Sequence, residues 1–164
     1  MKSSFYNLIA TLGIFTIFGN ISPAVSAQYS EILIAQKTIV QNPAEDLFNS
    51  GLAKSEAGDI EGAIADYTEA IRLNPNYAKA HNKLGIIRAR NLKDYPAAKA
   101  DFDRAIEINP NYGDAYYNRA RVREILEDKP GAIADYHKAA QLYEKDGNTN
   151  DYQDAINHLQ MLQE

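Results

Sequence analysis

The side chains that could carry out catalysis form no recognised pattern along the chain. The 164 residues include no cysteine, which excludes disulfide bonds, thiolate zinc sites and thiol nucleophiles. The histidines (His81, His137 and His158) are far apart, and no His-x-x-x-His spacing, serine–histidine–aspartate set or glycine-rich phosphate loop occurs. Asp101 and Asp103 fall on opposite sides of a predicted helix, where we expect solvated carboxylates. We therefore predict no enzymatic activity, no cofactor and no metal. A hydrolase or metal protein with an unrecognised site is the distant alternative.

Charge is unevenly distributed along the chain. The formal net charge is −5 at pH 7, which argues against a nucleic acid as partner because phosphate contacts need a basic surface. Residues 44–77 carry seven acids and two bases, whereas residues 78–112 carry four acids and seven bases. The middle of the chain is therefore the part that would attract an acidic segment.

An internal repeat organises most of the chain. The segments 62–77, 97–112 and 131–143 are variants of one pattern. Tyr67, Phe102 and Tyr136 hold the same place in each copy, at spacings of 35 and then 34 residues. Self-similarity at this period is typical of a solenoid made of helix pairs.

Start and stop signals predict seven helices after residue 42. Asn42, Asp59 and Asp128 are suited to cap helices, and Pro43 suits a first helical position, where a missing N–H is harmless. Helices should end before Asn–Pro, since the residue before proline avoids the helical region. The predicted helices cover about 43–57, 60–73, 77–90, 95–108, 113–127, 129–143 and 150–163.

Side-chain size indicates how these helices pack. Small residues at Gly51, Gly85 and Ala120 would allow close approach within a pair, and the bulky aromatic residues would fill the gap to the next pair. One pair cannot bury its apolar face alone, so successive pairs must stack. The last helix carries one apolar stripe and one polar face, as expected of a cap that covers the end of the stack. Its stripe consists of Tyr152, Ala155, Ile156, Leu159 and Leu162.

The residue pattern at the N-terminus is typical of a targeting segment. Lys2 precedes an apolar run from Leu8 to Phe18, and small residues at Val25 and Ala27 fit a signal-peptidase site. We predict a signal peptide over residues 1–27 and therefore an extracytoplasmic protein, periplasmic, lumenal or secreted. The alternative is an uncleaved segment that anchors the protein in a membrane. Residues 28–42 match neither helical nor strand periodicity and are interpreted as a linker or lead-in.

The repeated residues resemble the tetratricopeptide repeat, whose 34-residue pattern contains an aromatic residue, Leu-Gly, then Ala, Phe, Ala and a closing Pro. The resemblance predicts a domain over 43–147 with repeats at about 44–77, 78–112 and 113–147, followed by a capping helix at 148–164. It implies an all-α, right-handed helical-repeat solenoid of three antiparallel helix pairs. The second repeat carries Leu84, Gly85, Ala98, Phe102, Ala105 and Pro110 of the pattern.

The sequence also departs from the family pattern. Lys54, Arg88 and Arg123 replace the usual tyrosine late in each first helix, and Ser50 and Arg119 stand where leucine is common. Repeat two has one extra residue, expected in its turn around 91–93. In repeat three Glu144 takes the place of the closing proline, so its second helix should run on further.

Proteins of this family usually bind a peptide or protein in a concave groove lined by the first helix of each pair. The resemblance therefore implies an interaction module or scaffold, with a membrane-anchored assembly factor as the alternative. The family's clamp for a C-terminal carboxylate looks absent, because Phe48 and Leu52 replace its Lys and Asn and Asp114 replaces a later Lys. By register, the predicted partner-binding residues are Phe48, Leu52, Lys79, Asn82, Lys83, Ile86, Arg90, Tyr117, Asn118 and Arg121.

Four of these groove positions are basic: Lys79, Lys83, Arg90 and Arg121. One hypothesis is that they form a strip that receives an acidic peptide segment. The alternative is that they are solvated or pair with neighbouring acids, which contributes little. Phe48 and Tyr117 could likewise be aromatic anchors for a ligand or could pack against neighbouring helices.

Overall fold

The computed structural model describes residues 28–29 and 42–164. The predicted signal peptide and residues 30–41 of the predicted lead-in lie outside the described residues. Residues Pro43–Glu164 form one compact unit. In the described part of the chain no helix is both long and apolar enough to cross a membrane.

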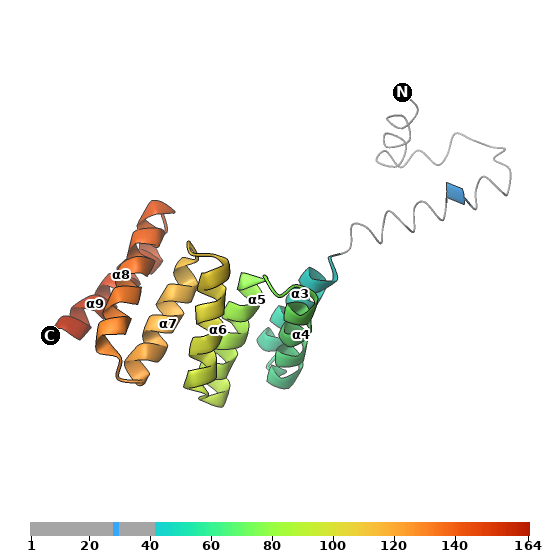
Figure 1. Cartoon of the computed structure of the whole chain (residues 1–164), viewed down its shortest axis with the longest axis horizontal. Coiled ribbons are helices and arrows are strands. Elements are labelled where there is room, and N and C mark those ends of the chain that lie inside the picture. The colour runs from blue at the N-terminus through green and yellow to red at the C-terminus, as the bar shows by residue number, and fades with distance from the viewer. Residues whose placement is uncertain (1–27, 30–41) are drawn as a thin grey trace, which may run out of the picture. The chain divides into compact units, whose positions relative to one another are not determined.

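The unit is built from helices that stand side by side in chain order (Figure 1). Each packs mainly against the helix before and the helix after it, and no strand occurs in residues 42–164. This confirms the predicted all-α solenoid of three helix pairs and a terminal helix. The elements are α3 (Pro43–Glu56), α4 (Ile60–Leu73), α5 (Ala78–Ile87), the π-helical turn η1 (Arg88–Leu92), α6 (Tyr95–Ile108), α7 (Gly113–Ile125), α8 (Lys129–Lys145) and α9 (Thr149–Gln163).

Side-chain caps fix where the second helix of each pair begins. Asp59, Asp94 and Asp128 each accept a hydrogen bond from the backbone N–H three residues further on, so the predicted caps at Asp59 and Asp128 are confirmed. Such a cap satisfies one of the N–H groups that a helix start leaves unpaired. Between pairs, Asn74 and Asn109 accept from the backbone N–H two residues on, which closes the turn before the next first helix.

The aromatic residues of the second helices pack on the small residues of the first helices. A Cβ added to Gly51 would lie 2.8 Å from the Tyr67 ring, and one added to Gly85 would lie 2.8 Å from the Phe102 ring. The rings therefore fill the space within their own pair. Glycine is required here because the ring occupies the place of a side chain. The rings also reach the next element, as expected: Tyr67 shares a buried cluster with Leu84 of α5, and the Tyr136 ring stacks on His158 of α9.

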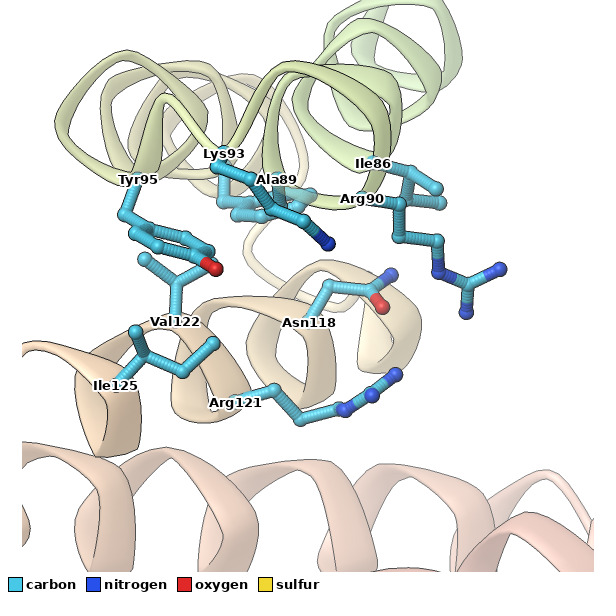
Figure 2. A pocket seen from close by; sticks show the side chains of 10 residues that line it. Ile86, Ala89, Arg90, Lys93, Tyr95, Asn118, Arg121, Val122 and Ile125 are labelled. Atoms are coloured by element: carbon cyan, nitrogen blue, oxygen red, sulfur yellow. The ribbon is translucent and has the colours of Figure 1, made fainter.

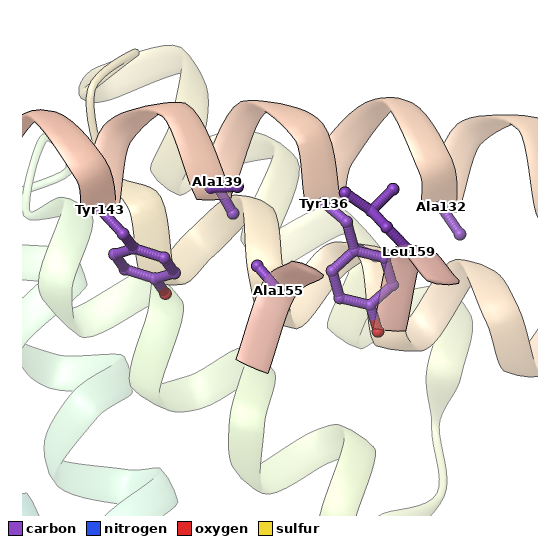
Figure 3. Packing of buried hydrophobic residues seen from close by; sticks show 8 residues of the cluster. Ala132, Tyr136, Ala139, Tyr143, Ala155 and Leu159 are labelled. Atoms are coloured by element: carbon purple, nitrogen blue, oxygen red, sulfur yellow. The ribbon is translucent and has the colours of Figure 1, made fainter. Parts of the chain in front are cut away.

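The C-terminal end of the stack is closed by α9, as predicted. Figure 3 shows Ala155 and Leu159 of α9 beside Tyr136 and Tyr143 of α8, all in one buried cluster. Tyr152, Ile156 and Leu162 pack against the same cluster. Without the closing proline, α8 has 17 residues, whereas α4 and α6 have 14 each, which confirms the predicted extension.

A buried aspartate precedes the aromatic residue in each repeat, and the first helix supplies its partner. Lys54 lies 2.7 Å from Asp66, Arg88 lies 2.6 Å from Asp101, and Arg123 Nη1 lies 2.9 Å from Asp135. The departures from the family pattern at positions 54, 88 and 123 therefore form one structural feature. Our expectation that Asp101 is solvated is wrong, because it is 8% exposed and paired with Arg88.

The extra residue of repeat two is absorbed at the end of a helix. We expected α5 to run to about Arg90 and the extra residue to lengthen the turn. Instead the chain makes a π-helical turn over Arg88–Leu92, after which Lys93 adopts a left-handed conformation with φ 56°. The N–H of Asp94 then donates to the carbonyl of Arg88, six residues earlier. In repeats one and three the N–H of the capping aspartate donates to the carbonyl five residues earlier.

Candidate functional site: a basic-rimmed pocket

A pocket of about 130 Å³ lies between the end of α5 with its π turn and the first helix of repeat three, α7. Its walls contain both apolar and basic side chains (Figure 2). The lining residues are Ile86, Ala89, Arg90, Lys93, Tyr95, Phe102, Asn118, Arg121, Val122 and Ile125.

The middle hydrophobic cluster of the solenoid forms the floor of this pocket. Phe102 and Val122 are buried in that cluster, and Ile86, Ala89 and Tyr95 pack against it. Ile125, by contrast, is 53% exposed at the end of α7. The pocket thus opens directly onto packed apolar side chains, which gives it a rigid apolar wall.

The pocket's three cations lack acidic partners. Among residues 42–164, no carboxylate lies within 4.0 Å of the charged groups of Arg90, Lys93 or Arg121. All three residues are exposed. Their positive charge is therefore left for a ligand, unlike that of the cations buried between the helices.

Other arginines near the pocket pair with acids inside the fold. Arg119 bonds Asp135 at 2.7 and 2.8 Å and Asp103 at 2.6 Å. Burial lowers the pKa of Arg119, but the hydrogen bonds that its guanidinium donates to these two carboxylates outweigh the effect of burial, and the net pKa is raised. Arg119 is thus a structural cation, although it lies two residues from Arg121.

Four of the ten predicted groove residues meet at the pocket: Ile86, Arg90, Asn118 and Arg121. The predicted basic strip is therefore divided, because Lys79 and Lys83 do not line this pocket. Neither of those lysines has an acid within ion-pair distance in the described part of the chain, and Lys79 is exposed. Within the described residues none of the four basic residues pairs with an acid, and Lys79, Arg90 and Arg121 are exposed, which agrees with the solvated form of the alternative interpretation.

The predicted aromatic contacts serve packing. Phe48 is 7% exposed, and its ring centre lies 5.7 Å from that of Tyr67 and 5.0 Å from that of Tyr77. Leu52 packs against the same cluster. Tyr117 is half-buried and makes edge contacts with Tyr136 and His158. We correct the prediction for Phe48, because its ring is already covered by its neighbours and is not presented to a ligand.

Asn82 is also occupied, and it positions a pocket residue. Its side chain is 2% exposed and donates to the Tyr112 hydroxyl at 3.1 Å. It accepts a hydrogen bond from the Asn118 side chain at 3.3 Å. Burial raises the pKa of Tyr112 further above its ordinary value. Asn82 therefore connects repeats two and three and holds Asn118 at the pocket, which is a correction to its predicted role as a direct ligand contact.

Sequence reasoning missed Lys93, Tyr95 and the apolar wall of Val122 and Ile125. The signal was present in the spacing of 35 residues between Tyr67 and Phe102, which marks an inserted residue just before Lys93. The spacing alone does not predict that a π turn absorbs the inserted residue. Separately, the described residues contain no group of His, Cys, Asp and Glu side chains placed to hold a metal ion.

Comparisons with known proteins agree with the helix pairs. A family model described as TPR repeat matches residues 51–91, and two described as Tetratricopeptide repeat match residues 78–112 and 102–157. None of the three describes a catalytic family. No curated protein matches the chain.

Solved structures show the same architecture. The first TPR of Spaghetti (RPAP3), bound to the HSP90 peptide SRMEEVD, has a TM-score of 0.66 and 25% identity over 74% of this chain and 90% of its own. The Arabidopsis OM64 TPR domain has a TM-score of 0.64 and 25% identity, and the match covers 73% of this chain and 95% of that domain. The TPR2B domain of yeast Sti1 in a pHsp70 complex has a TM-score of 0.69 and 23% identity, and the match covers 75% of this chain and 98% of that domain. This match shows a similar fold.

Proposed function

The chain belongs to the tetratricopeptide repeat family, whose models together match residues 51–157, and we propose that it is an interaction module that binds an acidic segment of a partner protein at the pocket between α5 and α7. One observation carries the proposal. Arg90, Lys93 and Arg121 meet at an apolar pocket, and no acid of the described chain pairs with them.

The charge pattern supports an acidic ligand. Long-range attraction between a basic patch and an acidic segment speeds their encounter, and short charge-assisted hydrogen bonds then hold it in place. The apolar floor adds contact area that a purely electrostatic site would lack. The pocket is preformed by packed helices, so little ordering of the protein opposes binding.

The similar domain of Spaghetti (RPAP3) supports the same class of ligand, because it is bound to a peptide, SRMEEVD, that contains three acidic residues. The position of the charges differs in this chain. At the two positions of repeat one that the family's carboxylate clamp uses, this chain has Phe48 and Leu52, and both pack against the hydrophobic core. We therefore propose recognition of acidic side chains within a segment rather than of a free C-terminal carboxylate.

The experiment is affinity capture with protein of residues 28–164, which contains the whole compact unit. The parent is compared with Arg90→Glu/Arg121→Glu and with a control variant of equal charge change, Arg72→Glu/Lys145→Glu, on the second helices of repeats one and three. We expect a partner held by the parent and the control and lost from the pocket variant. A partner held equally by all three would place the binding surface elsewhere, and the proposal would be wrong.

We further propose that the module works outside the cytoplasm, after removal of residues 1–27. Support comes from Lys2, the apolar run and the small residues before Gln28. Mass spectrometry of the protein from its native host should give Gln28 as the first residue. A protein that keeps residues 1–27 and needs detergent for extraction would instead be the membrane-anchored assembly factor.

A further inference from the structure

Two locally unfavourable backbone features coincide at the pocket. The π-helical turn spans Arg88–Leu92, and Lys93 directly after it has φ 56°, a region that side chains other than glycine rarely adopt. Both features cost stability, and such features are typical of binding and catalytic sites. Residues from this short stretch, Ala89, Arg90 and Lys93, line the pocket.

The other repeats show that the left-handed residue belongs to the turn, whereas the π turn is particular to repeat two. The position equivalent to Lys93 is Gly58 in repeat one, with φ 83°, and Glu127 in repeat three, with φ 62°. Both of those repeats close the turn with one residue fewer. Glycine in repeat one and glutamate in repeat three adopt the same conformation, so the turn does not require a lysine side chain at this position. Its side chain lines the pocket instead.

Most apolar side chains of the pocket gather at one end, and the arginine head groups lie toward the other, where Ile86 stands beside Arg90 (Figure 2). Tyr95, Val122 and Ile125 lie together at one end, and the guanidinium groups of Arg90 and Arg121 extend to the other. The ammonium group of Lys93 reaches into the space between them. At about 130 Å³ the pocket is smaller than typical small-molecule sites of about 300–1,000 Å³, so it suits one side chain of a longer ligand.

We infer that the inserted residue and Lys93 determine the ligand specificity of this module. They adapt the pocket to a peptide in which one apolar side chain is flanked by acidic residues. The apolar side chain enters between Val122 and Ile125, and the acids bond Arg90, Lys93 and Arg121. This inference rests on the proposed function and names the sequence class of its partner.

The test uses a displayed library of random heptapeptides and protein of residues 28–164. We expect enrichment of peptides that place Asp or Glu beside Leu, Ile, Met or Phe. The strongest is then synthesised with a fluorescent label, together with one peptide whose apolar residue is replaced by Ser and one whose acids are replaced by Asn or Gln. Each replacement should raise Kd by about tenfold or more.

Two protein variants test the inserted residue and Lys93 themselves. Deletion of Asn91 restores the shorter turn, and Lys93→Gly removes the ammonium group while relieving the backbone. Each should fold with an unchanged circular dichroism spectrum and bind the labelled peptide about tenfold more weakly. Glu127→Gly is the matched control, because it makes the same backbone change outside the pocket and should leave Kd unchanged.

The outcomes separate this inference from the proposed function. Enrichment of acidic peptides with no preference for an apolar neighbour, or equal binding by the parent, the Asn91 deletion and Lys93→Gly, would overturn the inference. In that case loss of partner capture by Arg90→Glu/Arg121→Glu would still support the proposed function. If that double variant also keeps its partner, both are wrong.

Discussion

At the scale of single residues, position alone does not tell which cations bind and which support the fold. Arg119 and Arg121 are two places apart on α7, yet Arg119 bonds two carboxylates and Arg121 has none in the described chain. Removal of one partner of a buried pair leaves the other charge uncompensated, whereas removal of an exposed, unpaired cation costs the fold little. Variants of Arg121 therefore report on binding, and variants of Arg119 report on stability.

The lysine that pairs with the buried aspartate of repeat one should make stability depend on pH. Hydrogen bonds from Lys54 and Ser50 lower the pKa of Asp66 below its ordinary value. A lowered folded-state pKa contributes stability that is present above the unfolded pKa and is lost as pH falls through the folded pKa. We expect Lys54→Met to unfold at lower urea concentration than the parent at pH 7, with the difference shrinking below about pH 4.

Urea unfolding at a series of pH values measures this difference. Arg72→Met is the control, because the Arg72–Glu69 pair is exposed and an exposed pair contributes little. A constant difference between the parent and Lys54→Met down to pH 2 would show that Lys54 stabilises the fold through packing alone.

The predictable part of the site was the part set by helical register. Ile86, Arg90, Asn118 and Arg121 were all identified from their places in the repeat. Phe48 and Asn82 follow the same register, but their exposure depends on Tyr77 and Tyr112 in the connecting turns. Register assigns a side chain to a face of its helix, and only the packed neighbours decide whether that face is open.

At the scale of elements, each helix pair depends on an aromatic ring lying over a residue without a bulky side chain. Gly85→Ala would place a Cβ 2.8 Å from Phe102 Cε1, and the ring is 1% exposed with little room to move. Overpacking of this kind costs about 1–3 kcal/mol, against a gain of about 1 kcal/mol in helix propensity. We expect Gly85→Ala to lower the free energy of unfolding, as measured in urea.

A second substitution tests whether the ring is the cause. Phe102→Leu shortens the side chain that meets the new methyl group, so Gly85→Ala should cost less in the Phe102→Leu background than in the parent. Two substitutions in direct contact are expected to be non-additive in this way. An additive result would mean that another neighbour of Gly85 limits the packing.

The spacing of 35 residues between Tyr67 and Phe102 shows which features of an element can be predicted from the sequence. It correctly revealed an extra residue in repeat two and its approximate place. A loop insertion and a π turn have the same length in sequence, and the choice between them depends on backbone hydrogen bonds. The bond from Asp94 to Arg88 keeps the aspartate at the start of α6, so the insertion is absorbed before it.

At the scale of the whole molecule, the sequence predicted the fold well because a solenoid is local. Each helix contacts mainly its neighbours in the chain, so helix periodicity and repeat spacing carry nearly all the information that the architecture needs. The chain order of α3 to α9 is also their spatial order (Figure 1).

The same local construction makes the terminal helix responsible for the end of the stack. Leu159 is 4% exposed in the cluster of α8 and α9, whereas Met161, two residues further along α9, is 61% exposed. Leu159→Asp would place a charge in that cluster and release α9, which would expose Tyr136 and Tyr143. We expect a fall of about 3 kcal/mol or more in the free energy of unfolding and self-association through the exposed face.

Urea unfolding and sedimentation at increasing protein concentration measure the two effects, and Met161→Asp is the matched control. Because its side chain lies outside the cluster, Met161→Asp should change stability by no more than about 0.5 kcal/mol and should sediment like the parent. A stable, monomeric Leu159→Asp protein would contradict the prediction. It would mean that α8 closes the solenoid without α9, since the exposed cluster would then neither destabilise the last repeat nor attract a second copy.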